Sequence, residues 1–582
     1  MGRTCTTHST STLPALPAQH LDATVGTVLS TGPIAMVGGW AGGALGSRPA
    51  SVPGCEAVSR SKGLIVAIAV TWFDSASMLA ERARLVDVLA ALSLTTDLVT
   101  GFPFERGLRA CLVADGLARA LDLDPPDHRA AFVASLVRAI GCGHASENAA
   151  LFGDDIAFER FLVTFDPGDG AVAGAQLAAF EAVVGAAGMQ KFLAVAPSVG
   201  PVAVRASCEV AVALGTQLGL PAAVVESFGD VFERWDGQGL PNGRAGEAVH
   251  PVAWIVAVAE QAAIAHALGG VPAARLEIDR RAGGHLDPSL CEVFLAHTEE
   301  IVAAIEEADD LVVAVRAAEP VPVLWFSAVD LERPCIALAT FADLKGFHLI
   351  GHSPHVTELT AEAARLAGLD EVGDLRVAAM LHDVGRAGVV SSIWDRPGPL
   401  GAADRERVRL HPHWTERVLS STPLLAALAP LAAAHHERLD GSGYHRGARA
   451  ADLPRGARLL AAADVLAAMT EDRPHRPAHT RDEAARLVQD EAVAGRLDPE
   501  MAAAVIEAVG MRRPRTAWPN DLTDREVDVL RLTARGLSNK EIAASLVVSP
   551  RTVQNHLAAT FDKTGRRTRA GAAVFAVEHG LI

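Results

Sequence analysis

The sequence predicts an all-α protein made of two helical bundles in tandem and a small terminal module of four short helices. From about residue 79 to residue 510, apolar residues recur at three- and four-residue spacing and alternating β-branched runs are almost absent, which indicates helices. A long internal repeat lies in the same region. The last stretch, residues 518–582, carries the start and stop signals of short helices. A chain of 582 residues is also too long for one core, and roughly three to five folding units are expected.

The N-terminal segment, residues 1–78, is predicted to be disordered. Up to about residue 60 it is rich in Ser, Thr, Gly, Ala and Pro and shows no helical or strand periodicity. Such a composition buries too little apolar area to offset the entropy of ordering. An alternative is that the protein starts downstream, near Met78, where a helical pattern begins.

The composition favours a soluble, cytoplasmic protein. Half of the residues are hydrophobic, but no charge-free apolar run approaches the ~20 residues that a membrane-spanning helix requires, so no membrane partner is expected. The start of the chain lacks the pattern of a secretory signal peptide. Seven cysteines lie far apart without a C-x-x-C pair, which fits a reducing compartment.

The internal repeat relates two stretches that align without gaps. FERWDGQGLPNGRAGEAVHPVAWIVAVAE, residues 232–260, matches HERLDGSGYHRGARAADLPRGARLLAAAD, residues 436–464, at a constant offset of 204. Near the start of each unit, residues 96–109 match residues 342–355 at an offset of 246. The change in offset indicates an insertion of about 40 residues in the first copy. Two related helical domains are therefore expected, at 79–317 and 318–512.

The second copy concentrates histidines and carboxylates. Neutral imidazoles and carboxylates that come from several helices are typical ligands of a buried site for iron, manganese or zinc. Two such cations a few ångströms apart can deprotonate a bridging water near neutral pH and stabilise an in-line phosphoryl displacement. The residues concerned are His352, His382, Asp383, His411, His435, His436, Glu437 and Asp464.

Four motifs, GHSPHV, LHDVGR, HPHW and HHERLDGSGY, follow one another in this copy. In this order and spacing they resemble the HD-GYP phosphohydrolases, a branch of the HD superfamily that cleaves cyclic di-GMP, over about residues 335–510. The resemblance implies an HD-type helical bundle and a divalent transition metal cofactor, which we expect to be two ions. The metal ligands that it implies are His352, His382, Asp383, His411, His435, His436 and Asp464.

The same resemblance implies three residues that act on the substrate. Asp383 would also help to position the hydrolytic water. Arg386 stands where the family has a lysine that touches the scissile phosphodiester. Arg473 matches an arginine that binds substrate phosphate.

Four departures from the family pattern leave the activity open. His445 replaces the proline of Gly-Tyr-Pro, and Arg386 replaces a lysine, which alters reach and geometry at a phosphate. His348 stands where members with three metals carry a glutamate. Ala467 replaces an aspartate that would orient a ligand, a loss that can cost about 10- to 100-fold in metal affinity or activity. Besides hydrolysis, a metal- or nucleotide-binding sensor and an inert helical spacer remain alternatives.

The first copy has lost these ligands. At the aligned positions, only Glu260, opposite Asp464, could bind a metal. This copy resembles a degenerate HD-GYP fold kept for packing, dimerisation or ligand sensing. Glu233 and Asp236 are retained, and we interpret them as loop-capping residues. The other aligned positions hold Arg106 opposite His352, Arg138 and Ala139 opposite His382 and Asp383, Ser207 opposite His411, and Val231 and Phe232 opposite His435 and His436.

The terminal module carries the signals of a helix-turn-helix unit. Thr523 and Glu526 form a predicted capping box for a first helix, which Gly536 ends. Ser538 caps a second helix and Ser549 a third, in which proline takes the first position. Two short helices joined by a tight turn and followed by a helix with an exposed polar face form a unit that enters a major groove. The second and third helices are expected at residues 539–546 and 550–564.

Residues 518–582 resemble the LuxR-type helix-turn-helix domain over their whole length, including the closing RTRAGA and EHGLI segments. The chain has a net charge of −17, but residues 521–582 hold nine basic and seven acidic side chains, so DNA contact would be confined to this module. Val553 and Leu557 are expected to pack inward. The residues expected to face bases are Gln554, Asn555 and Ala558, and those expected to contact phosphate are Thr552, His556, Lys563 and Arg567.

One such module is small, so specific binding to double-stranded DNA is expected to need a homodimer on two half-sites. The preferred interpretation is a bacterial transcription regulator whose HD-GYP domain hydrolyses or senses cyclic di-GMP or a related phosphodiester. The alternative is a cyclic di-GMP phosphodiesterase whose helix-turn-helix serves only localisation or protein contact.

Overall fold

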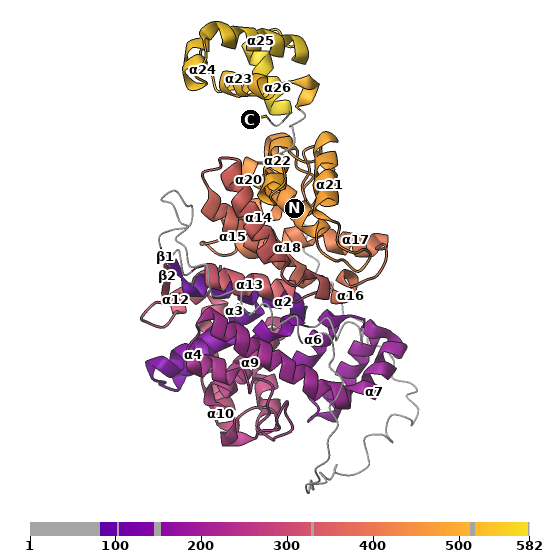
Figure 1. Ribbon diagram of the computed structural model, residues 1–582. Helices are drawn as coiled ribbons and strands as arrows, with labels where there is room; N and C mark the ends of the chain where they lie inside the picture. Colours follow the sequence, from indigo (N-terminus) through magenta and orange to yellow (C-terminus); the bar gives the residue numbers. More distant parts are fainter. Residues whose placement is uncertain (1–81, 102–103, 145–152, 328–330, 513–517, 580) are drawn as a thin grey trace, which may run out of the picture. The chain divides into compact units, whose positions relative to one another are not determined.

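The computed structural model describes residues 82–582 except 102–103, 145–152, 328–330, 513–517 and 580. The segment predicted to be disordered, residues 1–78, lies outside the described residues. The described strands form one antiparallel ribbon, in which β1 (Arg82–Arg84) pairs with β2 (Trp325–Ser327). Helices make up the rest of the regular structure (Figure 1), so the all-α fold class is confirmed.

The first copy of the repeat contains the helices that Figure 1 draws from indigo to pink. They are α2 (Leu85–Thr100), α3 (Arg106–Ala120), α4 (Pro125–Leu136), η1 (Arg138–His144), α6 (Asp155–Thr164), α7 (Gly170–Leu218), α8 (Ala222–Ser227), η2 (Gly246–Ala248), α9 (Pro251–Arg281), α10 (Pro288–Ala296), α11 (Thr298–Glu306) and α12 (Leu311–Ala318).

The second copy contains a similar succession of long and short helices. They are α13 (Glu332–Asp343), η3 (Phe347–Leu349), α14 (His352–Leu366), α15 (Val372–Leu381), η4 (Val384–Gly388), α16 (Ser391–Trp394), α17 (Ala402–Arg409), α18 (His411–Ser420), α19 (Ala429–Ala433), η5 (Ala450–Asp452), α20 (Arg455–Met469), α21 (Arg481–Val493) and α22 (Pro499–Ala508).

Corresponding helices of the two copies begin at the offsets of the sequence repeat. Helices α3 and α14 start 246 residues apart, and α9 and α20 start 204 residues apart. The loop before α9 and the loop before α20 are built alike. Glu233 accepts the amide N–H of Asn242 and Arg244, as Glu437 accepts those of Arg446 and Ala448. Glu233 and Glu437 therefore organise the same loop in both copies.

The second glycine of each D-G-x-G motif allows this loop to close. A Cβ on Gly239 would lie 2.3 Å from the backbone nitrogen of Arg234, and one on Gly443 would lie 2.4 Å from that of Arg438. Any larger residue would displace backbone at both places. This close approach explains why the glycine recurs at the offset of 204.

Both copies contribute to one large hydrophobic core. It runs from α2, α3, α4 and α9 of the first copy to α13, α15 and α18 of the second. Helices α14, α20, α21 and α22 enclose a second core, rich in alanine. Because the copies share a core, the boundary between residues 317 and 318 stays a prediction.

Two described helices, α7 and α9, are long and apolar enough to cross a membrane by length and composition alone. The most apolar window of α9 is 83% buried, as in a core helix, whereas that of α7 is 17% buried. Helix α7 is also interrupted at Gly185, where φ is 76°. Five described cysteines are buried and free, which fits the expected reducing compartment. The cytoplasmic location stays a prediction.

The terminal module forms the helices that its capping signals predict. The capping boxes of Thr523 with Glu526 and of Ser538 with Glu541 are both present, and Ser549 accepts the amide N–H of Thr552. Its own small cores are built from residues of all four helices. The elements are η6 (Pro519–Asp521), α23 (Asp524–Ala534), α24 (Asn539–Ser545), α25 (Pro550–Thr564) and α26 (Arg569–Glu578).

Candidate metal centre

The structure brings all seven expected ligands together inside the second copy, and Asp383 lies at their centre. Its Oδ1 is 3.2 Å from Nε2 of His411 and 3.3 Å from Nε2 of His435. Its Oδ2 is 2.9 Å from Nε2 of His382 and 3.5 Å from Nε2 of His352. The two oxygens of one carboxylate therefore face two different pairs of histidines.

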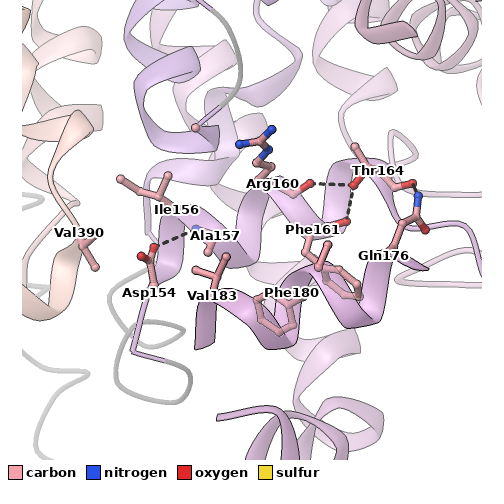
Figure 2. Close-up of a pocket in the computed structure, with 12 residues that line it drawn as sticks. Asp154, Ile156, Ala157, Arg160, Phe161, Thr164, Gln176, Phe180, Val183 and Val390 are labelled. Atoms are coloured by element: carbon pink, nitrogen blue, oxygen red, sulfur yellow. Dashed lines mark hydrogen bonds between the residues drawn. The ribbon is translucent and has the colours of Figure 1, made fainter. Parts of the chain in front are cut away.

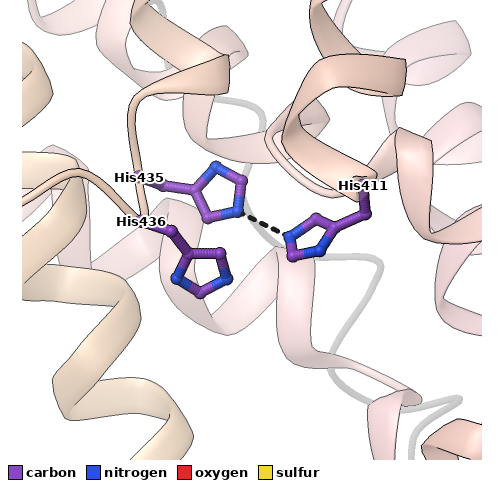
Figure 3. Close-up of side chains that lie close together, drawn as sticks. All are labelled: His411, His435 and His436. Carbon is purple, nitrogen blue, oxygen red and sulfur yellow. Dashed lines mark hydrogen bonds between the residues drawn. The ribbon is translucent and has the colours of Figure 1, made fainter. Parts of the chain in front are cut away.

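The remaining ligands complete three overlapping groups. Asp464, on α20, lies 3.1 Å from Nε2 of His352 and 3.6 Å from Nδ1 of His436. Figure 3 shows His411 at the start of α18 facing His435 and His436 from the loop after α19, with Nε2 of His411 3.0 Å from Nε2 of His435. The potential ligand atoms of each group lie within 4.8 Å of one another; the groups are His411, His435 and His436; His352, His382 and Asp464; and His382, Asp383 and His435.

The outer nitrogens of the histidines fix the orientation of the rings. Nδ1 of His382 is 2.6 Å from the carbonyl of Ala379, and Nδ1 of His435 is 2.7 Å from that of Ala432. His411 makes the same contact with the carbonyl of Val408. A carbonyl accepts only from a protonated nitrogen, so Nε2 is left to bind a metal. Three imidazoles are thus set up as ligands by helix backbone.

Several buried polar atoms at this centre lack a hydrogen-bond partner among the described residues. They include Nε2 of His382 and both carboxylate oxygens of Asp383. Both side chains are fully buried, where unsatisfied polar groups are costly. Imidazole and carboxylate ligands suit divalent iron, manganese and zinc. The residues therefore fit a divalent metal cofactor.

The charges at the centre also match a cation. Burial opposes ionisation of Asp383, but Arg386 and His382 outweigh it and hold the pKa of its carboxyl well below the usual range. Burial lowers the pKa of His411 to about 4, because the attraction of Asp383 offsets only part of it. Burial also lowers the pKa of His436 well below its ordinary value. Ionised carboxylates and neutral imidazoles are the forms that bind metal.

Metal binding is expected to release protons near neutral pH. Burial would lower the pKa of His382, but the carboxylates of Asp383 and Asp464 outweigh it and raise the pKa to about 10 in the ion-free site. At about pH 7.5 His382 therefore carries a proton that a metal must displace, and metal affinity should rise with pH until His382 is neutral. Calorimetry in buffers of different ionisation enthalpy measures this release. Binding without proton release would contradict the prediction.

A cavity of about 770 Å³ opens onto the metal centre. His411, His436, Tyr444 and Asp464 form its inner end. Arginines dominate its polar lining, as a substrate with phosphate groups requires. They are Arg386, Arg396, Arg405, Arg473 and Arg476.

The two arginines expected to act on substrate both lie in this lining. Nη2 of Arg386 is 2.6 Å from Oδ2 of Asp383, and its guanidinium stacks on the ring of Trp394. Nε and Nη1 of Arg386 are buried and have no hydrogen-bond partner among the described residues, so they can donate to a phosphate. Arg473 donates to Glu471 and to the carbonyl of His348.

Two functional residues escaped the sequence reasoning. Glu471 lies 2.8 Å from Nδ1 of His352, the one ligand histidine that a carboxylate orients in this way. Burial would raise the pKa of Glu471, but the contacts with His352 and His355 and the charge of Arg473 outweigh it and lower the pKa to about 2. Trp394 forms the wall behind Arg386. Neither Glu471 nor Trp394 belongs to one of the four motifs. The one sequence signal for Glu471 was its place two residues before Arg473.

The four departures from the family pattern take different positions. His445 is 3.3 Å from Glu416, and the preceding Tyr444 packs its ring on His436. His348 lines the cavity but belongs to none of the ligand groups formed by the described residues. Ala467 is fully buried in the alanine-rich core. None of these three positions supplies one of the seven expected ligands, whereas the fourth departure, Arg386, contacts Asp383 directly.

In the first copy, arginines occupy positions that correspond to expected metal ligands of the second copy. Nη1 of Arg106 is 2.8 Å from Oε1 of Glu260, and Nε of Arg138 is 2.5 Å from Oε2. These arginines stand where the second copy has His352 and His382, and Glu260 stands where it has Asp464. Two guanidinium groups therefore already neutralise the one carboxylate that could have bound a metal.

Replacing Glu260 by Gln is expected to lower the free energy of unfolding by about 3 to 5 kcal/mol, because the half-buried Arg138 and the buried Arg106 would lose the carboxylate that they share, leaving Arg106 paired with Asp97. The amount of bound metal should not change. Denaturant unfolding and metal quantification measure the two effects. Glu306→Gln, which removes an exposed carboxylate that pairs with the buried His266, serves as the control in the same copy. Metal loss in Glu260→Gln would show that the first copy binds an ion.

The recognition helix of the terminal module is α25. Val553 and Leu557 are buried, as predicted. Gln554, Asn555 and Ala558 are exposed together on its outer face. Their contacts with bases stay predictions.

The expected phosphate contacts differ in their surroundings. Arg567 is exposed, whereas Thr552 and His556 are half-buried. Lys563 donates to the carbonyl of Asp521 and pairs with Glu526 at 2.7 Å. A phosphate contact by Lys563 would compete with this pair, which the sequence did not reveal.

Comparisons with known proteins identify two domains. Residues 337–501 match the HD domain, and residues 520–576 match the bacterial regulatory proteins of the luxR family. A curated relative, the 3'3'-cGAMP-specific phosphodiesterase 3 of Vibrio cholerae, is 28% identical over 73% of this chain and 95% of its own length. The cyclic di-GMP phosphodiesterase of Thermotoga maritima is 34% identical over 27% of this chain and 43% of its own length.

A solved structure shares the fold. The crystal structure of a cyclic GMP-AMP specific phosphodiesterase of Vibrio cholerae covers 74% of this chain and 98% of its own, with a TM-score of 0.51 and 23% identity. At this identity the likeness supports the fold alone. The chain thus carries an HD domain followed by a LuxR-family DNA-binding domain, and its homologues are phosphodiesterases of the HD-GYP type.

Proposed function

We propose that this protein is a transcription regulator in which a metal-dependent cyclic dinucleotide phosphodiesterase is coupled to a LuxR-type DNA-binding output. One observation carries the proposal: the two oxygens of Asp383 face separate histidine pairs at the end of an arginine-lined cavity. A purely structural helical spacer has no reason to bury this set of ligands.

Two divalent ions are proposed as the cofactor. One would be held by His352, His382 and Asp464, the other by His411, His435 and His436, with Asp383 between them. When bound, such ions lower the pKa of a coordinated water and stabilise charge on phosphate oxygens. Iron, manganese and zinc all suit these ligands.

The chain's own residues divide the remaining work. In the hydrolysis, a water oxygen forms a bond to phosphorus, one P–O ester bond breaks, and the leaving oxygen takes up a proton. Asp383 orients the water from its position between the two histidine pairs. Arg386 and Arg473 hold the phosphate by charge-assisted hydrogen bonds, and the buried position of Arg386 strengthens them.

Cyclic di-GMP and 3'3'-cGAMP are the substrates to be compared. The names of the two relatives specify one each, and both compounds carry two phosphodiester groups that the arginines of the cavity can bind. A cavity of about 770 Å³ lies within the range of small-molecule sites.

Metal quantification and turnover assays on the purified full-length protein test the enzymatic part. The expected result is two transition metal ions per chain and conversion of a cyclic dinucleotide to its linear product. Metal-loaded protein that binds a cyclic dinucleotide without turnover would contradict the enzymatic proposal and favour a sensor. Protein that binds neither would contradict the site altogether.

DNA binding distinguishes regulation from localisation. The regulator proposed here should form a homodimer that selects defined duplexes from a randomised pool, since one module contacts only a half-site. An active phosphodiesterase that selects no sequence would favour the alternative, in which the terminal module serves localisation or protein contact.

A further inference from the structure

A buried charge pair joins the first copy to the second beside the active-site cavity. Asp155, the first residue of α6, and Lys345, just after α13, are both fully buried, and Nζ of Lys345 lies 2.5 Å from Oδ2 of Asp155. Asp155 also accepts the backbone N–H of Ser391 at 2.8 Å and its hydroxyl at 2.9 Å. One carboxylate therefore contacts two segments of the second copy.

Neighbouring contacts close the same seam. The hydroxyl of Ser392 donates to the carbonyl of Gly153 at 2.9 Å. Ile156 packs against an apolar cluster that includes Val390 and Ile393. Figure 2 shows Val390 beside Asp154 and Ile156 of the first copy, and all three line a second cavity, of about 480 Å³.

The two segments that Asp155 joins both lead into the lining of the active-site cavity and contact each other, since the backbone N–H of Phe347 donates to Asp395 at 3.2 Å. Lys345 is followed by His348 and Leu349, and Ser391 is followed by Ile393 and Trp394; these last four line the cavity. The guanidinium of Arg386 lies over the ring of Trp394, 5.4 Å from the ring centroid. A shift of Asp155 would therefore move Trp394, against which Arg386 packs.

The charge pair is not a requirement of the repeated fold. In the alignment at offset 246, the first copy has Val99 where the second has Lys345, and Val99 is equally buried. Asp155 lies between the aligned residues 139 and 207, which is where the first copy carries its insertion. The pair thus combines a lysine that only the second copy has with an aspartate from the stretch of the first copy in which the insertion lies.

We infer that Asp155 is a positioning residue for the phosphodiesterase site, so that the degenerate copy holds two lining segments of the substrate cavity of the other copy in place. The inference rests on the proposed function and assigns the first copy a role in it. Asp155 contacts none of the expected metal ligands. It acts through Lys345 and Ser391, whose segments line the cavity. Its loss should affect substrate binding more than metal binding.

The test compares three variants of the full-length protein. Asp155→Asn removes the charge but keeps the shape of the side chain. Asp155→Leu with Lys345→Met removes both charges and the acceptor for Ser391, so that no buried charge is left alone if the single variant fails to fold. The control is Asp166→Asn, which breaks a buried pair of the first copy with Arg234 and Arg280, away from the second copy.

The readouts are kcat, KM, metal content and the dissociation constant of a phosphorothioate analogue that resists hydrolysis. Both Asp155 variants should lose about 10- to 100-fold in kcat/KM, mainly through KM, and bind the analogue correspondingly more weakly. Metal content should stay at the wild-type value. Asp166→Asn should lower the melting temperature but leave kcat/KM unchanged.

Two results separate failure of this inference from failure of the proposed function. If wild type binds or cleaves the nucleotide and the double variant retains its kcat/KM and affinity, or Asp166→Asn loses as much, Asp155 has no positioning role. If wild type neither binds the analogue nor turns over substrate, the proposed function is wrong and the inference falls with it.

Discussion

Replacing Asp383 by Asn is expected to remove bound metal and to reduce cyclic dinucleotide hydrolysis by about a thousandfold or more. The carboxylate faces both histidine pairs, so its neutralisation weakens both proposed ion positions at once. It also leaves Arg386 without its 2.6 Å partner. Loss of a metal-held nucleophile and of its charge stabilisation is worth several kcal/mol.

Metal quantification and a turnover assay measure the effect of Asp383→Asn. The matched control is Asp498→Asn, which removes a buried, arginine-paired carboxylate from the same domain, 3.3 Å from Arg458 and outside the metal centre. The control should lose stability but keep its metal. Retention of metal and turnover by Asp383→Asn would show that the histidines alone form the site.

Local motifs were sufficient to predict which side chains meet at the candidate metal centre. His382 and Asp383 are adjacent in the chain, as are His435 and His436, so few helices have to meet to assemble the set. Each of these helices has an apolar face that fixes its orientation toward the core. The all-α class and the set of seven side chains that meet at the candidate metal centre therefore followed from composition, periodicity and resemblance.

The contacts between the copies could not be predicted in the same way. Lys345 follows Asp343 in the sequence, and nothing in its neighbourhood indicates that its partner is 190 residues away in the first copy. Glu471 and Trp394 escaped for the same reason: their roles depend on which side chain lies opposite. Periodicity places a residue on a face, but it does not name the residue across the interface.

The repeat also explains why the first copy keeps its fold without a metal. Glu260 survives at the position of Asp464, and burying it alone would be costly. Arg106 and Arg138 supply the positive charge from the positions of two lost histidines. Loss of the histidines and gain of the arginines are thus the same substitutions. The aligned sequences show these substitutions, but only the distances from the arginines to Glu260 explain them.

Replacing Asn555 by Ala is expected to weaken binding to the selected DNA site by about 10- to 100-fold per half-site and to relax its sequence preference. Asn555 is exposed on the outer face of α25, beside Gln554, and a lost bidentate contact to a base is worth about 1 to 3 kcal/mol. Arg567→Ala should instead weaken binding equally for all sequences and reduce the salt dependence, because a phosphate contact carries no sequence information.

Titrations with selected and scrambled duplexes at several salt concentrations distinguish these outcomes. Lys563→Ala provides the internal comparison, because its ammonium is already paired with Glu526 and should contribute less to DNA binding than the exposed Arg567. An Asn555→Ala variant that binds selected and scrambled duplexes as wild type does would mean that α25 does not read bases. Since Val553 and Leu557 fix the rotation of α25 by their burial, a different helix would then have to enter the groove.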